Sequence, residues 1–212
     1  MIQYKALPFN SFQVNTYIIW DDTFECAVID PAFNSSEERE YFDKFIKDHN
    51  LKPVRQMNTH CHADHLPGVT YMKTKYQLPF SAHRDEARQI KNAPVMGRMF
   101  GFDLKDLTPV GQYIDDNEII SFGNSTLKAI LVPGHSEGSL AYYSAEGHMV
   151  MTGDALFRDS IGRTDFPGGD HDTLIRSIRE KLFSLPPDTV VCPGHGPFST
   201  IGEEIGNNPY FN

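Results

Sequence analysis

The chain has 212 residues, of which 40% are hydrophobic and 12% aromatic, and its formal net charge at pH 7 is −9. This composition predicts a globular protein and excludes an intrinsically disordered, collagen-like or coiled-coil chain. The apolar runs fall far short of the ~18 residues that a membrane span needs, and the 19 Lys and Arg residues are scattered, which disfavours a general nucleic-acid or membrane binder.

The first half of the chain alternates strand-like and helix-like segments. Residues 13–29 are apolar on both sides of an Asp-Asp pair, which indicates a β-hairpin. Ser35 and Ser36 offer N-cap oxygens to a helix over residues 37–50. The segments that follow continue this order, with strands at 53–58 and 79–82 and helices at 66–76 and 84–92.

The second half is richer in strands. We expect strands at 118–122, 126–132, 140–144, 148–152 and 189–192 and helices at 173–183 and 200–205. The periodicity of residues 93–109 predicts no structure, and this Met- and Phe-containing segment is a candidate border of a substrate pocket.

Strands followed by helices in both halves favour an α/β (α+β) fold with helix-covered sheets over an all-β barrel. A four-layer sandwich and a doubly wound sheet both fit this pattern. Because no linker or low-complexity tract interrupts the chain, we expect one domain over residues 1–212. No secretory signal is visible, and Cys26, Cys61 and Cys192 are widely spaced, which predicts free thiols and a cytoplasmic location.

The segment at 59–65, THCHADH, follows an apolar strand and concentrates metal-binding side chains. Its four donors are His60, His62, Asp64 and His65. Alternate side chains of an extended turn point the same way, so the first three can face one cavity while Cys61 and Ala63 face away. Imidazole and carboxylate suit zinc and other first-row metals, whereas magnesium and calcium prefer oxygen cages.

Three later segments share one layout, an apolar strand that ends at a glycine-flanked donor. The donors are His135 in LVPGH, Asp154 in VMTGD and His195 in VVCPGH. Each histidine taken alone is more often a loop or core residue, but the combination with HxHxDH favours a metal site. The total of seven donors suits two metal ions that share a bridging carboxylate.

With these motifs the sequence resembles the metallo-β-lactamase superfamily over nearly its whole length. The resemblance implies a four-layer αβ/βα sandwich with the metals at one edge between the sheets. It also implies that His60, His62 and His135 hold the first metal. Asp64, His65 and His195 would then hold the second metal, with Asp154 bridging and Cys61 not a ligand.

A narrower resemblance lies in GDALFRDSIGRTDFPGGD at 153–170, PGHGP at 193–197 and NNPYF at 207–211. These stretches are similar to the short glyoxalase II-like enzymes, the hydroxyacylglutathione hydrolases, which implies hydrolysis of a thioester such as S-D-lactoylglutathione. The GRTDF stretch is also similar to persulfide dioxygenases, which use a single iron. Those enzymes usually carry AHDY where this chain has GHGP, which favours hydrolysis.

The expected cofactor is two divalent metal ions, with zinc the first choice and iron or manganese as alternatives. A metal ion lowers the pKa of its bound water from ~16 to ~7, which supplies a nucleophile without serine or cysteine. We expect Asp64 to orient this nucleophile. The metals make the site a local positive centre, which would attract a small anionic thioester, and Arg163 is a candidate substrate contact.

Three functions of different kinds remain open: a two-metal thioester hydrolase, an iron dioxygenase using His60, His135 and Asp154, and a non-catalytic metal-binding domain. A structural zinc site is closed by four ligands, so donors on four separate loops disfavour the last. A phosphodiesterase or nuclease could use the same donors, but the chain has no clustered basic surface. The acyl group, the thiol and the oligomeric state are not predicted.

Overall fold

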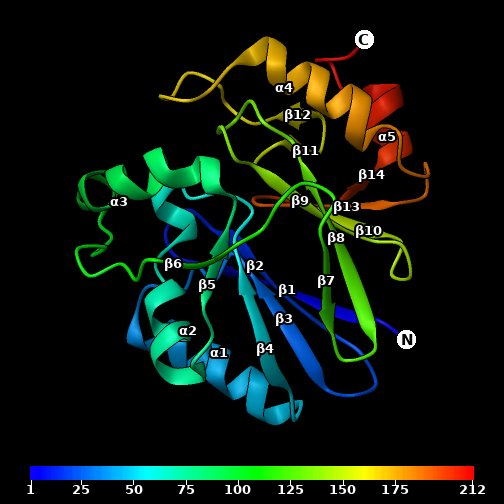
Figure 1. Ribbon diagram of the computed structural model, residues 1–212. Coiled ribbons are helices and arrows are strands. Elements are labelled where there is room, and N and C mark those ends of the chain that lie inside the picture. Colours follow the sequence, from blue (N-terminus) through cyan, green and yellow to red (C-terminus); the bar gives the residue numbers. More distant parts are fainter.

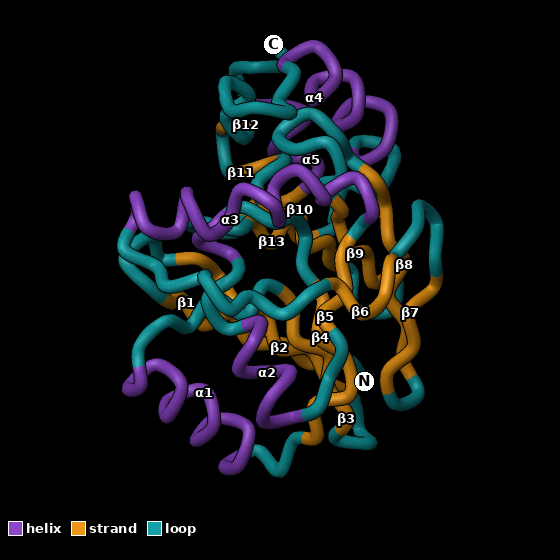
Figure 2. The backbone as a smooth tube through the Cα atoms, turned by 60° about the vertical axis from the view of Figure 1, so that its left-hand side comes forward, coloured by secondary structure: helices purple, strands orange, loops and turns teal.

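The computed structural model describes residues 1–212 as two six-stranded sheets packed face to face (Figures 1 and 2). The first sheet has the order β1-β2-β3-β4-β5-β6, with strands Gln3–Phe9, Val14–Trp20, Glu25–Ile29, Lys52–Met57, Phe80–Ala82 and Val110–Tyr113. The second has the order β14-β13-β10-β9-β8-β7; in chain order its strands are β7 Ile119–Phe122, β8 Ser125–Leu131, β9 Leu140–Ser144, β10 Met149–Gly153, β13 Val190–Pro193 and β14 Ser199–Thr200. A separate small hairpin pairs β11, Leu156–Phe157, with β12, Ser160–Ile161.

Helices cover the outer faces of both sheets (Figure 1). The helices are α1 Ser36–Asp48, α2 Val69–Tyr76, α3 Ala87–Phe100, α4 His171–Ser177, which continues as a π-helical turn over Ile178–Leu182, and α5 Ile201–Asn207. Short 3-10 turns lie at Ala63–His65 and Arg84–Glu86. Helices α1 and α2 flank the first sheet, α4 and α5 flank the second, and α3 lies at the edge of the sandwich (Figure 2).

Strand β2 shows why the layers stack in this way. All of its residues are buried, because both of its faces are covered. Tyr17 and Ile19 point into the core between the two sheets, and Ile18 and Trp20 point into the core under α1 and α2. A third core lies between the second sheet and helices α4 and α5. The four-layer sandwich is therefore confirmed, and the doubly wound sheet is wrong.

Helix α1 begins where its capping residues predict. The Ser35 side chain accepts from the backbone N–H of Glu38, and the Glu38 carboxylate accepts from the backbone N–H of Ser35, which completes a capping box. Phe42 and Ile46, one turn apart, are buried against the first sheet. The capping box and the buried apolar residues thus both indicate a helix over this segment.

Several elements differ from the sequence-based expectation. Helix α3 runs on to Phe100 through the segment at 93–109 whose structure was not predicted, although Pro94 cannot donate a backbone hydrogen bond within it. Strands β1 and β6 were not predicted either. Their outer positions are largely exposed, so their strand structure comes from pairing with β2 and β5. No helix combines the length and apolar composition needed to cross a bilayer.

Candidate metal centre

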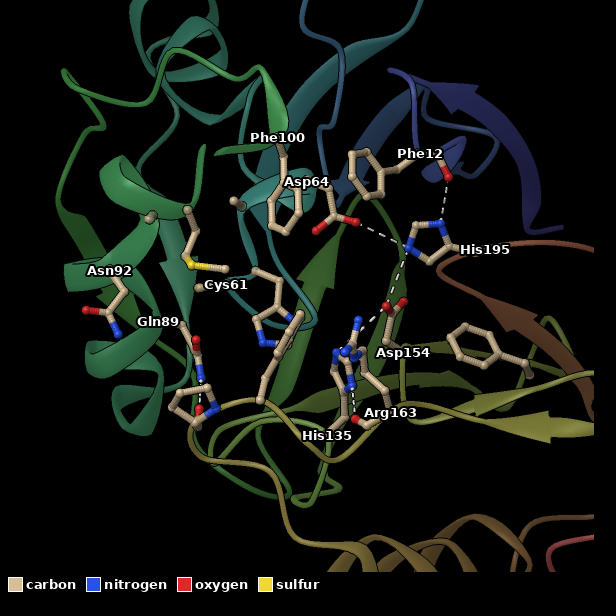
Figure 3. Close-up of a pocket in the computed structure, with 17 residues that line it drawn as sticks. Phe12, Cys61, Asp64, Gln89, Asn92, Phe100, His135, Asp154, Arg163 and His195 are labelled. Atoms are coloured by element: carbon tan, nitrogen blue, oxygen red, sulfur yellow. Dashed lines mark hydrogen bonds and ion pairs between the residues drawn. The ribbon is translucent and has the colours of Figure 1, made fainter. Parts of the chain in front are cut away.

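The predicted donors follow the ends of strands β4, β8, β10 and β13, and Figure 3 labels four of them, Asp64, His135, Asp154 and His195, around one cavity. Strand β4 leads into the loop with HxHxDH, and β8 leads toward His135. Strands β10 and β13 run parallel and Gly153 pairs with Pro193, so the residues that follow them emerge at the same edge. Parallel pairing therefore explains why Asp154 and His195 meet.

The structure brings all seven predicted donors together. They form three sets, each with its candidate ligand atoms within 4.8 Å of one another. The sets are His60, His62 and His135; His60, His65 and Asp154; and Asp64, His65 and His195. The first and third are the two ligand sets that the resemblance implies, and the second links them. Cys61 belongs to none of these sets.

Asp154 lies between the two ligand sets. Its Oδ1 is 3.5 Å from His65 Nε2, and its Oδ2 is 3.7 Å from His135 Nε2 and 3.4 Å from His195 Nε2. Oδ1 is buried and has no hydrogen-bond partner. A Cβ at Gly194 would stand 2.2 Å from this oxygen, so only glycine leaves room for the carboxylate here. This position suits a carboxylate that binds cations on both sides.

Backbone carbonyls fix the tautomers of two of the rings. His135 Nδ1 is 2.8 Å from the carbonyl oxygen of Arg163, and His195 Nδ1 is 2.9 Å from that of Phe12. A carbonyl oxygen only accepts, so each Nδ1 carries a proton, and each ring in its neutral form presents the lone pair of Nε2 to the cluster. His195 Nε2 lies 3.4 Å from His65 Nε2. Such facing nitrogens are suited to metal coordination.

Asp30 orients two more rings. Its Oδ2 lies 3.1 Å from His65 Nδ1 and accepts the hydroxyl hydrogen of Thr59, while Oδ1 accepts the Thr59 backbone N–H. The Thr59 oxygen, 3.1 Å from His60 Nδ1, is then available to accept from that ring. Asp30 was not predicted as a site residue. It follows an apolar strand, as Asp154 does, and this shared layout could have indicated it.

The charges of the cluster fit a bound cation. Burial and the neighbouring imidazoles lower the pKa of His62 to about 3. Burial alone would lower the pKa of His195, but its hydrogen bonds to Asp154 and Asp64 raise it to about 9. Burial opposes ionisation of Asp154, but the charge of His65 holds the pKa of the carboxyl well below its usual range. The carboxylates thus favour positive charge beside them. Protonated imidazoles supply this charge in the absence of metal, and divalent ions would replace those protons on binding.

Glu86 connects two of the donor loops through hydrogen bonds to one buried carboxylate. The side chain is fully buried, and its Oε2 accepts from the backbone N–H of Cys61 at 2.6 Å. Oε1 accepts from the Ser136 hydroxyl at 2.6 Å and from the Gly138 backbone N–H at 2.9 Å. Glu86 directly precedes α3, so one carboxyl group connects this helix with two donor loops. Sequence reasoning missed it, because it lies far from every motif.

We expect Glu86→Ala to lower the free energy of unfolding by about 2 to 6 kcal/mol, because two buried backbone N–H groups lose their acceptor at about 1 to 3 kcal/mol each, while the Ser136 hydroxyl keeps Ser139 as a partner. Urea unfolding of the purified protein measures this. Glu40→Ala, which removes an exposed carboxylate from α1, should change the free energy by no more than about 0.5 kcal/mol. A loss below about 1 kcal/mol in Glu86→Ala would contradict the role of Glu86.

A cavity of about 310 Å³ opens directly onto the donors (Figure 3). Its floor includes His62, Asp64, His135, Asp154 and His195. One wall comes from helix α3, which places part of the unassigned segment at the pocket border, as expected. Cys61 and Ala63 also line this cavity, so the expectation that they face away from it is wrong. The short 3-10 turn at Ala63–His65 replaces the extended backbone on which that expectation relied.

Arg163 lies at the pocket, as its prediction as a substrate contact requires. Its guanidinium donates to both oxygens of Asp165, at 2.7 Å each, and stacks 3.8 Å from the ring centroid of Phe166. Its carbonyl holds His135 in place. The Arg163 backbone thus supports the donor cluster, while its role in substrate binding stays a prediction.

Known proteins are similar to this chain over most of its length. The chain is 32% identical to the probable metallo-hydrolase YqgX of Bacillus subtilis, over 100% of this chain and 98% of that protein. It is also 32% identical to hydroxyacylglutathione hydrolase GloC of Haemophilus influenzae, over 98% of this chain and 97% of that protein. Human mitochondrial persulfide dioxygenase ETHE1 is 33% identical over 92% of this chain and 70% of its own length.

Solved structures show the same fold. BLEG-1, a B3 metallo-β-lactamase, superposes with a TM-score of 0.89 at 31% identity, over 99% of this chain and 100% of that one. TTHA1623 in a di-iron-bound form gives a TM-score of 0.87 at 31% identity, over 97% and 99%. A family model described as the metallo-β-lactamase superfamily matches residues 10–195, which include every predicted donor. This chain therefore belongs to the metallo-β-lactamase superfamily, as an enzyme of the metal-dependent hydrolase type.

Proposed function

We propose that the protein is a thioester hydrolase that acts on substrates such as S-D-lactoylglutathione with two divalent metal ions. The observation that carries the proposal is the position of Asp154 between two donor sets at the floor of an open cavity. A structural metal site would be closed by its ligands, whereas this one leaves room for a substrate. Similarity to the hydroxyacylglutathione hydrolase GloC supports the choice of thioester.

The residues present fit two metal ions. In this proposal His60, His62 and His135 hold one ion, Asp64, His65 and His195 hold the other, and Asp154 contacts both. Zinc is the first choice for this mixture of imidazole and carboxylate, with iron or manganese as alternatives. Bound divalent ions lower the pKa of water and polarise a carbonyl oxygen, which is the chemistry that ester and thioester cleavage needs.

Hydrolysis adds the oxygen of one water molecule to the carbonyl carbon and breaks the C–S bond. One proton of that water ends on the departing sulfur, and the other leaves the new carboxylic acid for solvent. Asp64 lines the cavity, and its Oδ2 lies 3.4 Å from His195 Nε2. From there its carboxylate can accept a hydrogen bond from the attacking water and orient the oxygen toward the substrate.

The remaining parts of the proposal concern the substrate and the compartment. Arg163 is the proposed contact for an anionic substrate, and that contact requires its ion pair with Asp165 to open. We propose a cytoplasmic location, because all three cysteines are buried free thiols, which suits a reducing compartment. The physiological partner is proposed to be a small thioester, not a nucleic acid or a membrane.

A second candidate is an iron-dependent persulfide dioxygenase. The observation in its favour is the similarity to ETHE1, at 33% identity. In that case His60, His135 and Asp154 would hold a single iron, and these three meet in the structure. Its chemistry consumes oxygen, whereas thioester hydrolysis does not.

We expect a single anaerobically purified, metal-loaded sample to cleave S-D-lactoylglutathione and to take up no oxygen with glutathione persulfide. Ultraviolet absorbance of the thioester and an oxygen electrode follow the two reactions in parallel. The ratio of metal to protein, measured on the same sample, should approach two. Oxygen uptake without loss of thioester would overturn the proposed function in favour of the dioxygenase.

A further inference from the structure

The cavity beside the donors has an apolar wall formed by one face of α3. Ala93, Met96 and Phe100 follow one another at helical spacing, and all three line the cavity next to the polar Gln89 and Asn92 of the same helix. Phe12, from the loop between β1 and β2, extends this wall, with its ring centroid 5.4 Å from that of Phe100. Figure 3 shows both rings beside the donors.

A second part of the lining is also apolar and begins at the donors themselves. The ring of Phe166 lies edge-on, 5.7 Å from that of His62, and Pro167 follows it in the lining. Phe157, from β11, lies 6.3 Å from the ring of His195. A group attached directly to the reacting carbonyl would therefore contact hydrocarbon close to the donors.

The lining offers little to a charged substrate group outside the donor cluster. Arg163 is the only Lys or Arg side chain that lines the cavity. Both oxygens of Asp165 already accept from it, and its flat face covers the Phe166 ring. Gln89 donates to the Pro167 carbonyl at 2.8 Å and so bridges the two walls. Outside the donor cluster, a carboxylate in this space would meet a cation only after the ion pair between Arg163 and Asp165 had opened.

We infer that this cavity is an acyl subsite for thioesters whose acyl group is apolar, with an aromatic ring preferred over a methyl group. The thiol arms of biological thioesters are polar and often charged, whereas the acyl group is the part that an apolar wall can bury. The inference rests on the proposed function and specifies its substrate class. Burial of the acyl group next to the carbonyl also excludes competing water from that side.

A matched pair of substrates tests this inference on the unmodified metal-loaded protein. S-D-mandeloylglutathione and S-D-lactoylglutathione share the thiol and the α-hydroxy acid and differ by phenyl against methyl. We expect kcat/KM to be at least about 10-fold higher for the mandeloyl substrate, since small apolar contacts change this ratio by 10-fold or more. Isothermal titration calorimetry should show D-mandelate binding at least about 10-fold more tightly than D-lactate, independently of turnover.

Two methionines on α3 provide a variant and its control. Met96 lines the cavity, whereas Met99 is 71% exposed and does not. We expect Met96→Ala to reduce the mandeloyl-to-lactoyl ratio of kcat/KM to about 3-fold or less. The shorter alanine side chain removes an apolar contact of the phenyl ring and leaves a space in its place. Met99→Ala should keep the ratio of the unmodified protein. Thermal unfolding of both variants establishes that they are folded when assayed.

The possible failures are distinguishable. If the unmodified protein hydrolyses both thioesters but favours the lactoyl substrate or treats them equally, the acyl subsite is wrong and the proposed function stands. If it hydrolyses neither, the proposed function is wrong, and the inference falls with it. A ratio that Met99→Ala reduces as much as Met96→Ala would also overturn the assignment of the cavity.

Discussion

Asp154→Ala should abolish thioester hydrolysis and reduce the bound metal well below two ions per chain. Even residues that only support metal ligands are worth about 10- to 100-fold in affinity or activity, so we expect kcat/KM to fall by more than about 10³-fold when this carboxylate is removed. The reason is its position, within 3.4 to 3.7 Å of ring nitrogens from both donor sets. Elemental analysis and an assay on S-D-lactoylglutathione measure both quantities.

Asp188→Ala is the matched control, because that carboxylate is exposed, lies outside the cavity and pairs only with His148 at the surface. The control should keep its metal and its activity. The far-ultraviolet circular dichroism of both variants should match that of the unmodified protein, since neither change touches a hydrophobic core. Full turnover by Asp154→Ala would contradict a bridging role for this residue.

Zinc added to metal-stripped protein should raise the midpoint of thermal unfolding by about 8 to 16 °C. A ligand that binds only the folded state at about 1,000 times its Kd stabilises by about 4 kcal/mol. For a domain of about 150 to 250 residues, each kcal/mol shifts the midpoint by about 2 to 4 °C. The donors meet only in the folded chain, because they come from four separate loops. Scanning calorimetry of stripped and reloaded protein measures the shift.

Magnesium provides the comparison, since it prefers oxygen ligands and this cluster is rich in imidazole. We expect magnesium at the same concentration to move the midpoint by less than about 2 °C. The Asp154→Ala variant should respond to zinc much less than the unmodified protein does. An unchanged midpoint with zinc would show that the seven side chains do not act as a metal site.

The donor residues could be predicted because their signals are local. HxHxDH places four donors within six residues, and His135, Asp154 and His195 each follow a glycine at the end of an apolar strand. The strand pairing then brings these loops to one edge, as the parallel register of Gly153 and Pro193 shows. A sequence pattern can therefore predict a site when one short motif contains several of the residues that meet in the fold.

The residues that support the donors could not be predicted in the same way. Glu86 contacts Cys61 across 25 positions and Gly138 across 52, and nothing in its neighbourhood distinguishes it from an exposed glutamate. Helix α3 continues beyond Pro94, because packing of Ala93 and Gly97 against Phe102 and Leu104 outweighs the lost backbone bond. Tertiary packing decides both cases, and a single sequence does not reveal it.

The connection between β2 and the loop before His195 affects the order in which the protein folds. Asn15 donates its side-chain amide to the Pro193 carbonyl, and Tyr17 donates its hydroxyl to the same oxygen, across 178 and 176 positions. Contacts this distant in the chain form slowly, because a long loop must close first. During synthesis His195 can join the other donors only after residues 1–195 have left the ribosome. Nascent chains that end before residue 195 therefore lack one of the seven donors that meet in the folded protein.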